Sequence, residues 1–137
     1  MPDDLSLLQS SIETYFAAGS SAIGDASAME AFLTMRAWLS AGRIRAAEPD
    51  PGAPYGWRVN AWVKRGILLG FRLGQLEAMG GHDLAFVDKG TFPARRLGVE
   101  DGVRIVAGGS AVREGAYVAR SVICAPPMYI NVGAYVD

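Results

Sequence analysis

The six-residue spacing of apolar residues near the C-terminus constrains the fold more than any other feature of the sequence. One row at this spacing consists only of apolar side chains: Val106, Val112, Val118, Cys124, Ile130 and Val136. A second row, four residues further on, is small or apolar: Ser110, Ala116, Val122, Met128 and Ala134. A helix repeats every 3.6 residues and a strand every two, so neither explains the pattern. A parallel β-helix does, because each six residues form one side of a three-sided coil.

A repeated tetrapeptide supports this interpretation. Gly-Ala-Tyr-Val occurs at residues 115–118 and again at 133–136, eighteen residues or three sixes later. Tyr117 and Tyr135 therefore take equivalent places one coil apart, where we expect them to stack for structural reasons. The buried row also contains Cys124, which we interpret as a small core residue rather than a nucleophile.

The start of the six-residue register divides the chain. We predict an α+β fold with a mixed helical domain over residues 1–102 and the first coils of a left-handed parallel β-helix over residues 103–137. Gly108 and Gly109 are expected to form a corner or bulge, since no Lys-Ser/Thr follows them to make a phosphate-binding loop.

Three amphipathic helices are predicted before the repeats. The first spans residues 3–17, and the second follows Asp25 or Ser27 as its N-cap and ends near Gly42. The third extends from Asn60 through Phe71, and its two internal glycines are expected to mark a close approach to a neighbouring helix.

Short strands and loops are predicted to connect these helices. Residues 43–47 and 84–87 are predicted strands. Residues 48–56, rich in proline and glycine, predict a hairpin or loop, and residues 91–102 predict a loop.

Composition excludes several classes of function. The chain has 137 residues and a net charge of −1, which gives no electrostatic reason to expect nucleic acid as a partner. No apolar run reaches the roughly 18 residues of a membrane span, and the acidic N-terminus is unlike a signal peptide. With a single cysteine and no internal disulfide, a reducing cytoplasm is the expected location, without a membrane partner.

Several segments, in this order, are similar to one enzyme family. They are Arg43–Glu48 (RIRAAE), Trp62–Arg72 (WVKRGILLGFR), Phe86–Lys89 (FVDK), Val103–Val106 (VRIV), Ala111–Ala119 (AVREGAYVA) and Pro126–Asp137 (PPMYINVGAYVD). Together they resemble the bacterial tetrahydrodipicolinate N-succinyltransferases of lysine and diaminopimelate biosynthesis. The resemblance covers the whole chain but only about the N-terminal half of the family's usual length.

The resemblance implies a homotrimeric enzyme that transfers succinyl from succinyl-CoA to the amino group of an acyclic form of tetrahydrodipicolinate. Succinyl-CoA would be a co-substrate, and no tightly bound cofactor or metal is expected. In the family, the catalytic coils follow the Gly-Ala-Tyr-Val-Asp segment, so no catalytic residue is assigned in this chain. We therefore expect a truncated chain with negligible activity of its own. Two alternatives stay open: a non-catalytic, self-associating module, and a related hexapeptide-repeat acyltransferase with another acceptor amine.

Basic side chains are the candidates for binding a substrate that carries two carboxylates. Lys64, Arg65 and Arg72 on the third predicted helix are the candidate substrate-binding residues, and the alternative is that they form its solvated face. Arg95 and Arg96 are interpreted as an exposed loop pair rather than a clamp for the phosphates of CoA.

Two further polar residues are given local roles. His82, the only histidine, is interpreted as a turn residue between glycines and an aspartate. A metal site is not expected, because a β-helix that binds zinc would need several imidazoles. Asn131 is expected to form either a hydrogen-bonded ladder or a turn contact.

Overall fold

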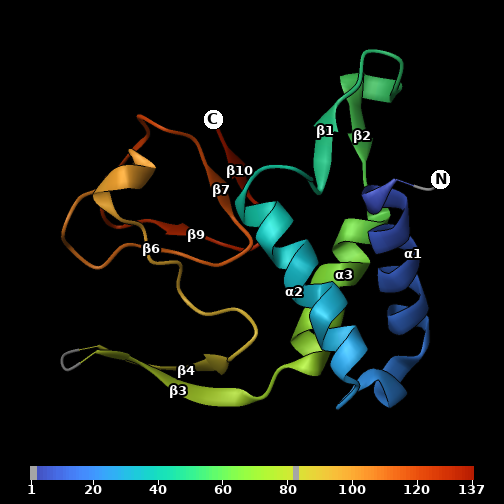
Figure 1. Cartoon of the computed structure of the whole chain (residues 1–137). Coiled ribbons are helices and arrows are strands. Elements are labelled where there is room, and N and C mark those ends of the chain that lie inside the picture. The colour runs from blue at the N-terminus through green and yellow to red at the C-terminus, as the bar shows by residue number, and fades with distance from the viewer. Residues whose placement is uncertain (1–2, 82–83) are drawn as a thin grey trace.

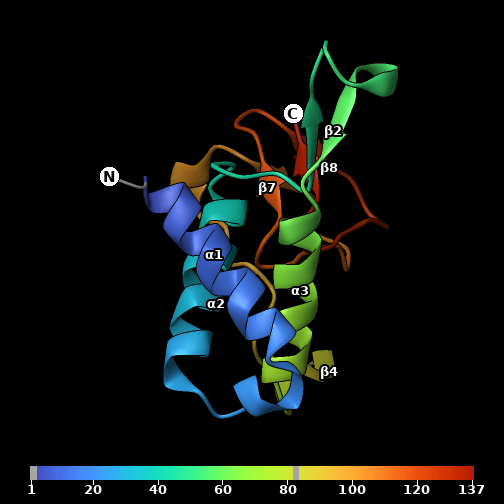
Figure 2. The same cartoon turned by 90° about the vertical axis from the view of Figure 1, so that its right-hand side faces the viewer.

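The computed structural model describes residues 3–81 and 84–137, and the predicted turn residue His82 lies outside them. Three α-helices pack together on one side of the molecule, and a set of short strands lies beside them (Figures 1 and 2). The helices are α1 (Asp4–Ala17), α2 (Ala26–Ser40) and α3 (Ala61–Leu73). This α+β architecture agrees with the sequence. None of the described helices is long and apolar enough to cross a membrane.

The first helix begins where its sequence provides a cap. The Asp3 carboxylate accepts a hydrogen bond from the Ser6 N–H at 2.7 Å, which satisfies a donor that the helix leaves without a partner. This hydrogen bond lowers the pKa of Asp3. Leu8 and Ile12, one turn apart, are buried, as the predicted helix requires. A 3₁₀ turn, η1 (Gly19–Ala22), then leads to α2.

Both ends of α2 follow the sequence prediction. Of the two candidate caps, Asp25 is the N-cap, and its carboxylate accepts the Ser27 N–H at 2.8 Å. At the other end Gly42 has a φ of +72°, which glycine adopts without steric cost. The Arg43 N–H then donates to the Trp38 carbonyl at 2.9 Å, closing the helix in a Schellman motif.

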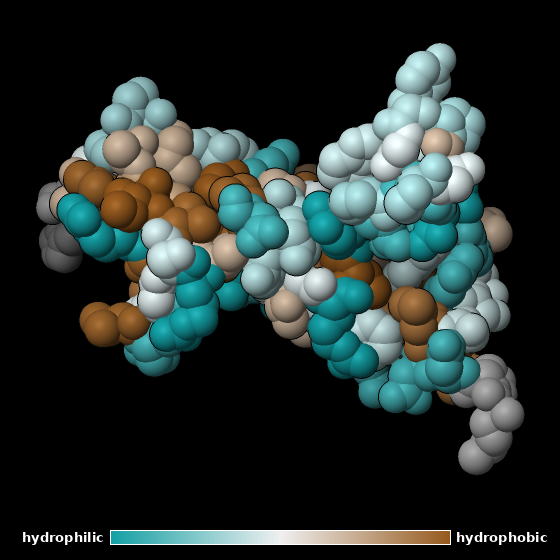
Figure 3. Space-filling model, turned by 90° about the horizontal axis from the view of Figure 1, so that it is seen from above, coloured by the Kyte–Doolittle hydropathy of each residue, from teal (hydrophilic) through white to brown (hydrophobic). Residues whose placement is uncertain are grey.

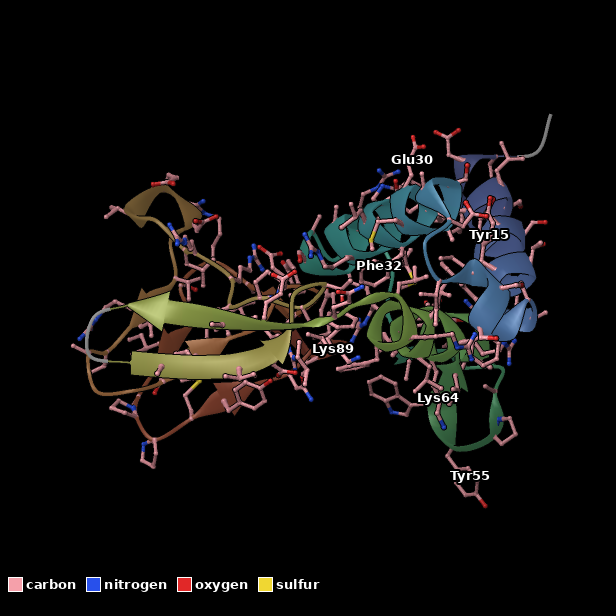
Figure 4. All side chains as sticks on the ribbon, turned by 90° about the horizontal axis from the view of Figure 1, so that it is seen from below. Tyr15, Glu30, Phe32, Tyr55, Lys64 and Lys89 are labelled. Atoms are coloured by element: carbon pink, nitrogen blue, oxygen red, sulfur yellow. The ribbon has the colours of Figure 1, made fainter. Side chains whose placement is uncertain are left out.

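The glycines of α3 permit close packing against α2. A Cβ added at Gly66 would lie 2.1 Å from Met35 Sδ, and one at Gly70 would lie 2.2 Å from Phe32 Cε2. Neither position has room for a side chain, so the predicted close approach of α3 to a neighbouring helix is confirmed. Phe32 points between the helices in Figure 4.

The core of the helical part is made of large side chains from all three helices and from a later segment that contains Phe92. Its largest fully buried members are Phe32, Phe92, Ile12, Met35, Leu69 and Val63. Phe92 lies outside the three helices, yet its ring meets Phe32 edge-on at a centroid distance of 5.2 Å. This segment is therefore anchored in the helical core.

Two antiparallel hairpins extend from the helices (Figure 1). The first pairs β1 (Ala47–Pro49) with β2 (Trp57–Val59), with η2 (Pro54–Gly56) between them. Of the two predicted alternatives, a hairpin or a loop, the structure has the hairpin. The second pairs β3 (Leu76–Gly81) with β4 (Leu84–Lys89); β4 was predicted, whereas β3 was not.

The predicted strand over residues 43–47 is wrong except at Ala47, where β1 begins. Arg43 completes the end of α2, and the guanidinium groups of Arg43 and Arg45 lie over aromatic rings. Within this stretch Ala46 continues the β1–β2 pairing by accepting the Asn60 N–H at 2.9 Å, whereas the side chains of Arg43 and Arg45 contact aromatic rings.

Six two-residue strands follow η3 (Val99–Asp101): β5 (Arg104–Ile105), β6 (Ala111–Val112), β7 (Tyr117–Val118), β8 (Ile123–Cys124), β9 (Tyr129–Ile130) and β10 (Tyr135–Val136). They pair in parallel as β5 with β8, β6 with β9 and β7 with β10. The register joins Tyr117 to Tyr135 and Val112 to Ile130, both eighteen residues apart. The repeat inferred from the sequence is therefore the spacing of hydrogen-bonded neighbours.

The first pair departs from this register by one residue. Ile105, not Val106, pairs with Cys124, so the apolar row begins one position earlier than its six-residue spacing predicts. The additional residue is absorbed between β5 and β6, at Gly108 and Gly109, whose φ values are +150° and +89°. The prediction of a corner or bulge at these glycines agrees with this geometry.

The inward side chains of these strands form a second, smaller core. Val112, Ala116 and Val118 are buried in it, and the partly buried Ile130 and Val136 pack against it. Cys124 is also buried, at 6% exposure, as predicted for a core residue. The division into domains at residues 102 and 103 remains a prediction.

Candidate functional site

The predicted substrate-binding residues of α3 lie in three different surroundings. Arg65 donates from Nε to the Glu13 carboxylate of α1 at 2.6 Å and makes a second hydrogen bond from its terminal nitrogen. This hydrogen bonding lowers the pKa of Glu13 and raises that of Arg65. The two side chains are more than a third exposed, so solvent screens much of their attraction.

Arg72 and Lys64 are separated from this ion pair. Arg72 donates to the Phe16 carbonyl at 2.9 Å, and its guanidinium carbon lies 4.9 Å from the centre of the Phe16 ring. Lys64 is exposed on the surface of α3 (Figure 4). The structure thus joins Arg65 and Arg72 to α1 but does not bring the three cations to one point. Their role in substrate binding remains a prediction.

Arg95 is not the exposed residue that the sequence predicted. Its guanidinium donates to the Ser40 carbonyl at the end of α2, at 3.2 Å, and to the Ala116 carbonyl at 2.8 Å. Arg95 therefore joins the helices to the parallel strands. Its neighbour Arg96 is exposed, in agreement with the prediction.

Arg113 is the most heavily bonded arginine of the described residues, and sequence reasoning missed it. Its side chain is 10% exposed and forms an ion pair with Asp88 of β4 at 2.6 Å. Nε donates to the Phe92 carbonyl at 2.9 Å, and Nη1 donates to the Tyr129 hydroxyl at 3.2 Å and to the Asn131 side-chain oxygen at 3.5 Å. These bonds connect the β3–β4 hairpin, the segment after it and two successive coils of strands.

The contacts of Arg113 define its role. Its guanidinium carbon lies 5.4 Å from the Phe71 ring centre and 5.5 Å from that of Phe92, so two aromatic faces shield it from water. Most of its N–H groups donate to protein acceptors, so Arg113 fixes structure rather than presenting an open anion site. One signal could have found it: Arg113 directly follows the inward Val112 and so points out of the strand core, toward the rest of the chain.

Further hydrogen bonds connect the end of α2 to the segment before β7. The Ser40 hydroxyl donates to the Glu114 carboxylate at 3.1 Å and accepts the Gly115 N–H at 2.8 Å. Gly42 lies against Tyr117, since a Cβ there would be 2.7 Å from that ring. The end of α2 therefore fits directly on β7.

The expectations for Asn131 and the paired tyrosines are also resolved. Asn131 makes the turn contact, accepting the Val132 N–H at 2.8 Å through its side-chain oxygen. Tyr117 and Tyr135 stack with ring centroids 4.4 Å apart, as predicted.

Arginines thus anchor the repeat of strands to the helical part of the chain. The chain falls in the class of α+β proteins with an 18-residue parallel-strand repeat. A protein-family model described as "Tetrahydrodipicolinate N-succinyltransferase N-terminal" matches residues 7–73. The chain is related to the N-terminal part of the tetrahydrodipicolinate N-succinyltransferases, which confirms the resemblance found in its sequence.

Curated relatives extend this match beyond the helices. The 2,3,4,5-tetrahydropyridine-2,6-dicarboxylate N-succinyltransferase of Sodalis glossinidius is 37% identical over 139 residues, covering 95% of this chain and 48% of that protein. The enzyme of that name from Escherichia coli is 36% identical, over 93% of this chain and 47% of its own length. That of Leptothrix cholodnii is 41% identical over 68% of this chain. The chain spans about half the length of the first two relatives.

Proposed function

We propose that the chain provides the N-terminal part of an enzyme that transfers succinyl from succinyl-CoA to the amino group of tetrahydrodipicolinate, in lysine and diaminopimelate biosynthesis. Two observations together support this most directly: the family model for the N-terminal region matches residues 7–73, and the chain spans about half the length of relatives with this enzyme's name. Lys64, Arg65 and Arg72 stay the candidates for contacting the carboxylates of the substrate.

We further propose that residues 103–137 begin a left-handed parallel β-helix of hexapeptide repeats. Three parallel strand pairs, with two of them in an eighteen-residue register, support this proposal. In such a coil the half-buried Ile130 and Val136 would gain cover from a further layer of side chains. A homotrimer and a cytoplasmic location are proposed on the resemblance.

The activity proposal is tested by completing the chain. We would join residues 1–137 in register to the remaining half of the Escherichia coli relative and measure thiol release from succinyl-CoA with the dicarboxylate acceptor. The chimera should be active, whereas residues 1–137 alone should show negligible turnover, because they span only about half the length of their relatives. A folded chimera without activity would contradict the proposed function. Turnover by residues 1–137 near that of a full relative would contradict the expected inactivity.

The alternative of a self-associating, non-catalytic module has one observation in its favour. Ile123 of β8 and Tyr129 of β9, on successive strands of the same coil, are each 59% exposed. Light scattering on residues 1–137 separates the possibilities, because a monomer at all concentrations would exclude self-association through these strands.

A further inference from the structure

A polar hollow of about 570 Å³ lies between the start of α1, the end of α2, the β1–β2 hairpin and the start of α3. Its charged lining residues are Arg43, Arg45, Arg58, Arg65 and Glu48. Four arginines against one carboxylate make a concentration of positive charge in a chain whose net charge is −1. Figure 3 shows hydrophilic surface over this helical side, whereas apolar surface gathers over the strands at the left.

Two of these arginines are already neutralised by carboxylates. Arg65 pairs with Glu13 of α1, as described above. Arg58 pairs with Glu48 and, at 3.4 Å, with Asp50. The positive charge that is left for a ligand therefore belongs to the other two arginines.

Arg43 and Arg45 have aromatic neighbours instead of carboxylates within the part of the chain that the structure describes. The guanidinium carbon of Arg43 lies 3.9 Å from the Trp38 ring centre, and that of Arg45 lies 3.6 Å from the Tyr135 ring centre. Stacking on an aromatic ring fixes the orientation of a guanidinium group, and the N–H groups at its edge remain able to donate hydrogen bonds.

Arg45 has a donor that its protein surroundings do not satisfy. Its Nε is buried and has no hydrogen-bond partner among the described residues. A buried donor without an acceptor is costly, and such groups in folded proteins usually have a partner from the protein, water or a ligand. Because Nε is closed to solvent, contact with a ligand in the hollow falls to the terminal N–H groups of Arg45.

The first turn of α3 adds further donors to the same hollow. Ala61 and Trp62 line it, and Asn60 at the N-cap makes no side-chain hydrogen bond to the helix. The Asn60 amide instead donates to the Arg45 carbonyl and to the Glu48 carboxylate, both at 2.8 Å. The positive end of the α3 helix dipole therefore has no side-chain cap and can attract an anion. Among the described residues that line the hollow, the only carboxylate is that of Glu48, which already accepts hydrogen bonds from Arg58 and Asn60.

We propose that this hollow binds a small oxyanion with two negative charges, a phosphate or a dicarboxylate. The guanidinium groups of Arg43 and Arg45 and the first-turn N–H groups of α3 are its donors. Charge-assisted hydrogen bonds from planar guanidiniums suit both ligands, which share paired anionic oxygens. The donors assigned here, Arg43, Arg45 and the first-turn N–H groups of α3, differ from the substrate-binding candidates Lys64, Arg65 and Arg72, although Arg65 lines the same hollow.

The test titrates residues 1–137 with inorganic phosphate and, separately, with succinate at constant ionic strength, following backbone amides by NMR. Saturable shifts of the Ala61 and Trp62 amides are expected. Arg43→Gln and Arg45→Gln should each weaken binding about tenfold, as expected for one charge-assisted hydrogen bond. The matched control is Arg96→Gln, which removes the same charge from an exposed residue that does not line the hollow.

The site is supported if either probe binds saturably and if Arg43→Gln and Arg45→Gln weaken that binding. The probe that binds more tightly shows whether the hollow prefers a phosphate or a dicarboxylate. Absence of saturable binding for both probes overturns the proposal, as does an equal loss in Arg96→Gln. Thermal melting checks that each variant folds. If Arg45→Gln does not fold, the exposed Arg43→Gln decides the result alone.

Discussion

The helical part and the strand part of this chain are stabilised in different ways. In the helical core, large side chains such as Phe32, Met35 and Ile12 have no exposed surface. In the strand core, Val112 is buried, but Ile130 and Val136 remain half-buried because they belong to the last coil. The comparison teaches that the helices, together with Phe92 of the following segment, cover their core completely. The strand core instead depends on polar anchors to the helices and keeps part of its apolar surface exposed.

The largest expected effect tests the helical core. Phe32→Ala should lower the free energy of unfolding by about 3–5 kcal/mol, because it removes a fully buried ring that packs against Gly70 and Phe92. Urea denaturation measures the change. Leu33→Ala is the matched control on the same helix, with a side chain that is 41% exposed and an expected loss of about 1 kcal/mol or less. Equal losses would show that Phe32 is no more deeply buried on α2 than Leu33.

The next effect tests the polar anchors. Arg113→Gln should cost about 2 kcal/mol, less than a fully buried pair, because its partner Asp88 stays 47% exposed and can be hydrated. Hydrogen exchange should accelerate in β3 and β4, which Arg113 ties to β6. Arg120→Gln, which loses one exposed hydrogen bond to the Glu100 carbonyl, provides the control. Unchanged exchange in the hairpin would contradict the anchoring role.

Much of the helical part could be predicted because its signals are local. Asp25 begins α2 and Gly42 ends it, both through contacts within a few residues. The spacing of apolar residues in α1 likewise predicts a helix without knowledge of its distant neighbours. Strand β3 was missed because Met79, Gly80 and Gly81 lack alternating polarity, and only pairing with β4 makes them a strand.

The anchors could not be predicted for a related reason. Arg113 meets Asp88 across 25 residues, and Arg95 meets the Ser40 carbonyl across 55. Such pairs are set by the packing of the two parts, which residue spacing does not encode. The repeat itself was predictable, but its first apolar residue was assigned to Val106 instead of Ile105. Counting in sixes does not reveal the one additional residue near Gly108.

A smaller effect compares two layers of the strand core. Val112→Ala should lower the free energy of unfolding by about 2 kcal/mol, since Val112 is only 2% exposed. Val136→Ala makes the same chemical change in the last paired strand and should cost less than about 1 kcal/mol. Denaturation of both variants under one set of conditions provides the measurement. Similar losses would mean that the last coil is as well covered as the inner one.

The smallest effect concerns the ion pair between α1 and α3. Arg65 lowers the pKa of Glu13 from its ordinary value of 4.5, so the pair stabilises the folded chain above that pH. This contribution is lost as the pH falls through the lowered pKa, where Glu13 becomes protonated in the folded state. The stability difference between the wild-type chain and Glu13→Gln should therefore be present at pH 7, shrink below pH 4.5, and decrease in high salt. A difference that is constant across this range would contradict the ion pair.

The corner at Gly108 and Gly109 suggests where the chain can be lengthened. The extra residue there shifts the first strand by one position, while every later pair keeps its eighteen-residue spacing. A side chain at Gly109 would meet open space, because no atom lies within 4 Å of a Cβ placed there. A short epitope or a fluorescent label inserted after Gly109 would accordingly leave the stacking of the later strands in phase, making this corner a practical attachment point for following the protein in solution.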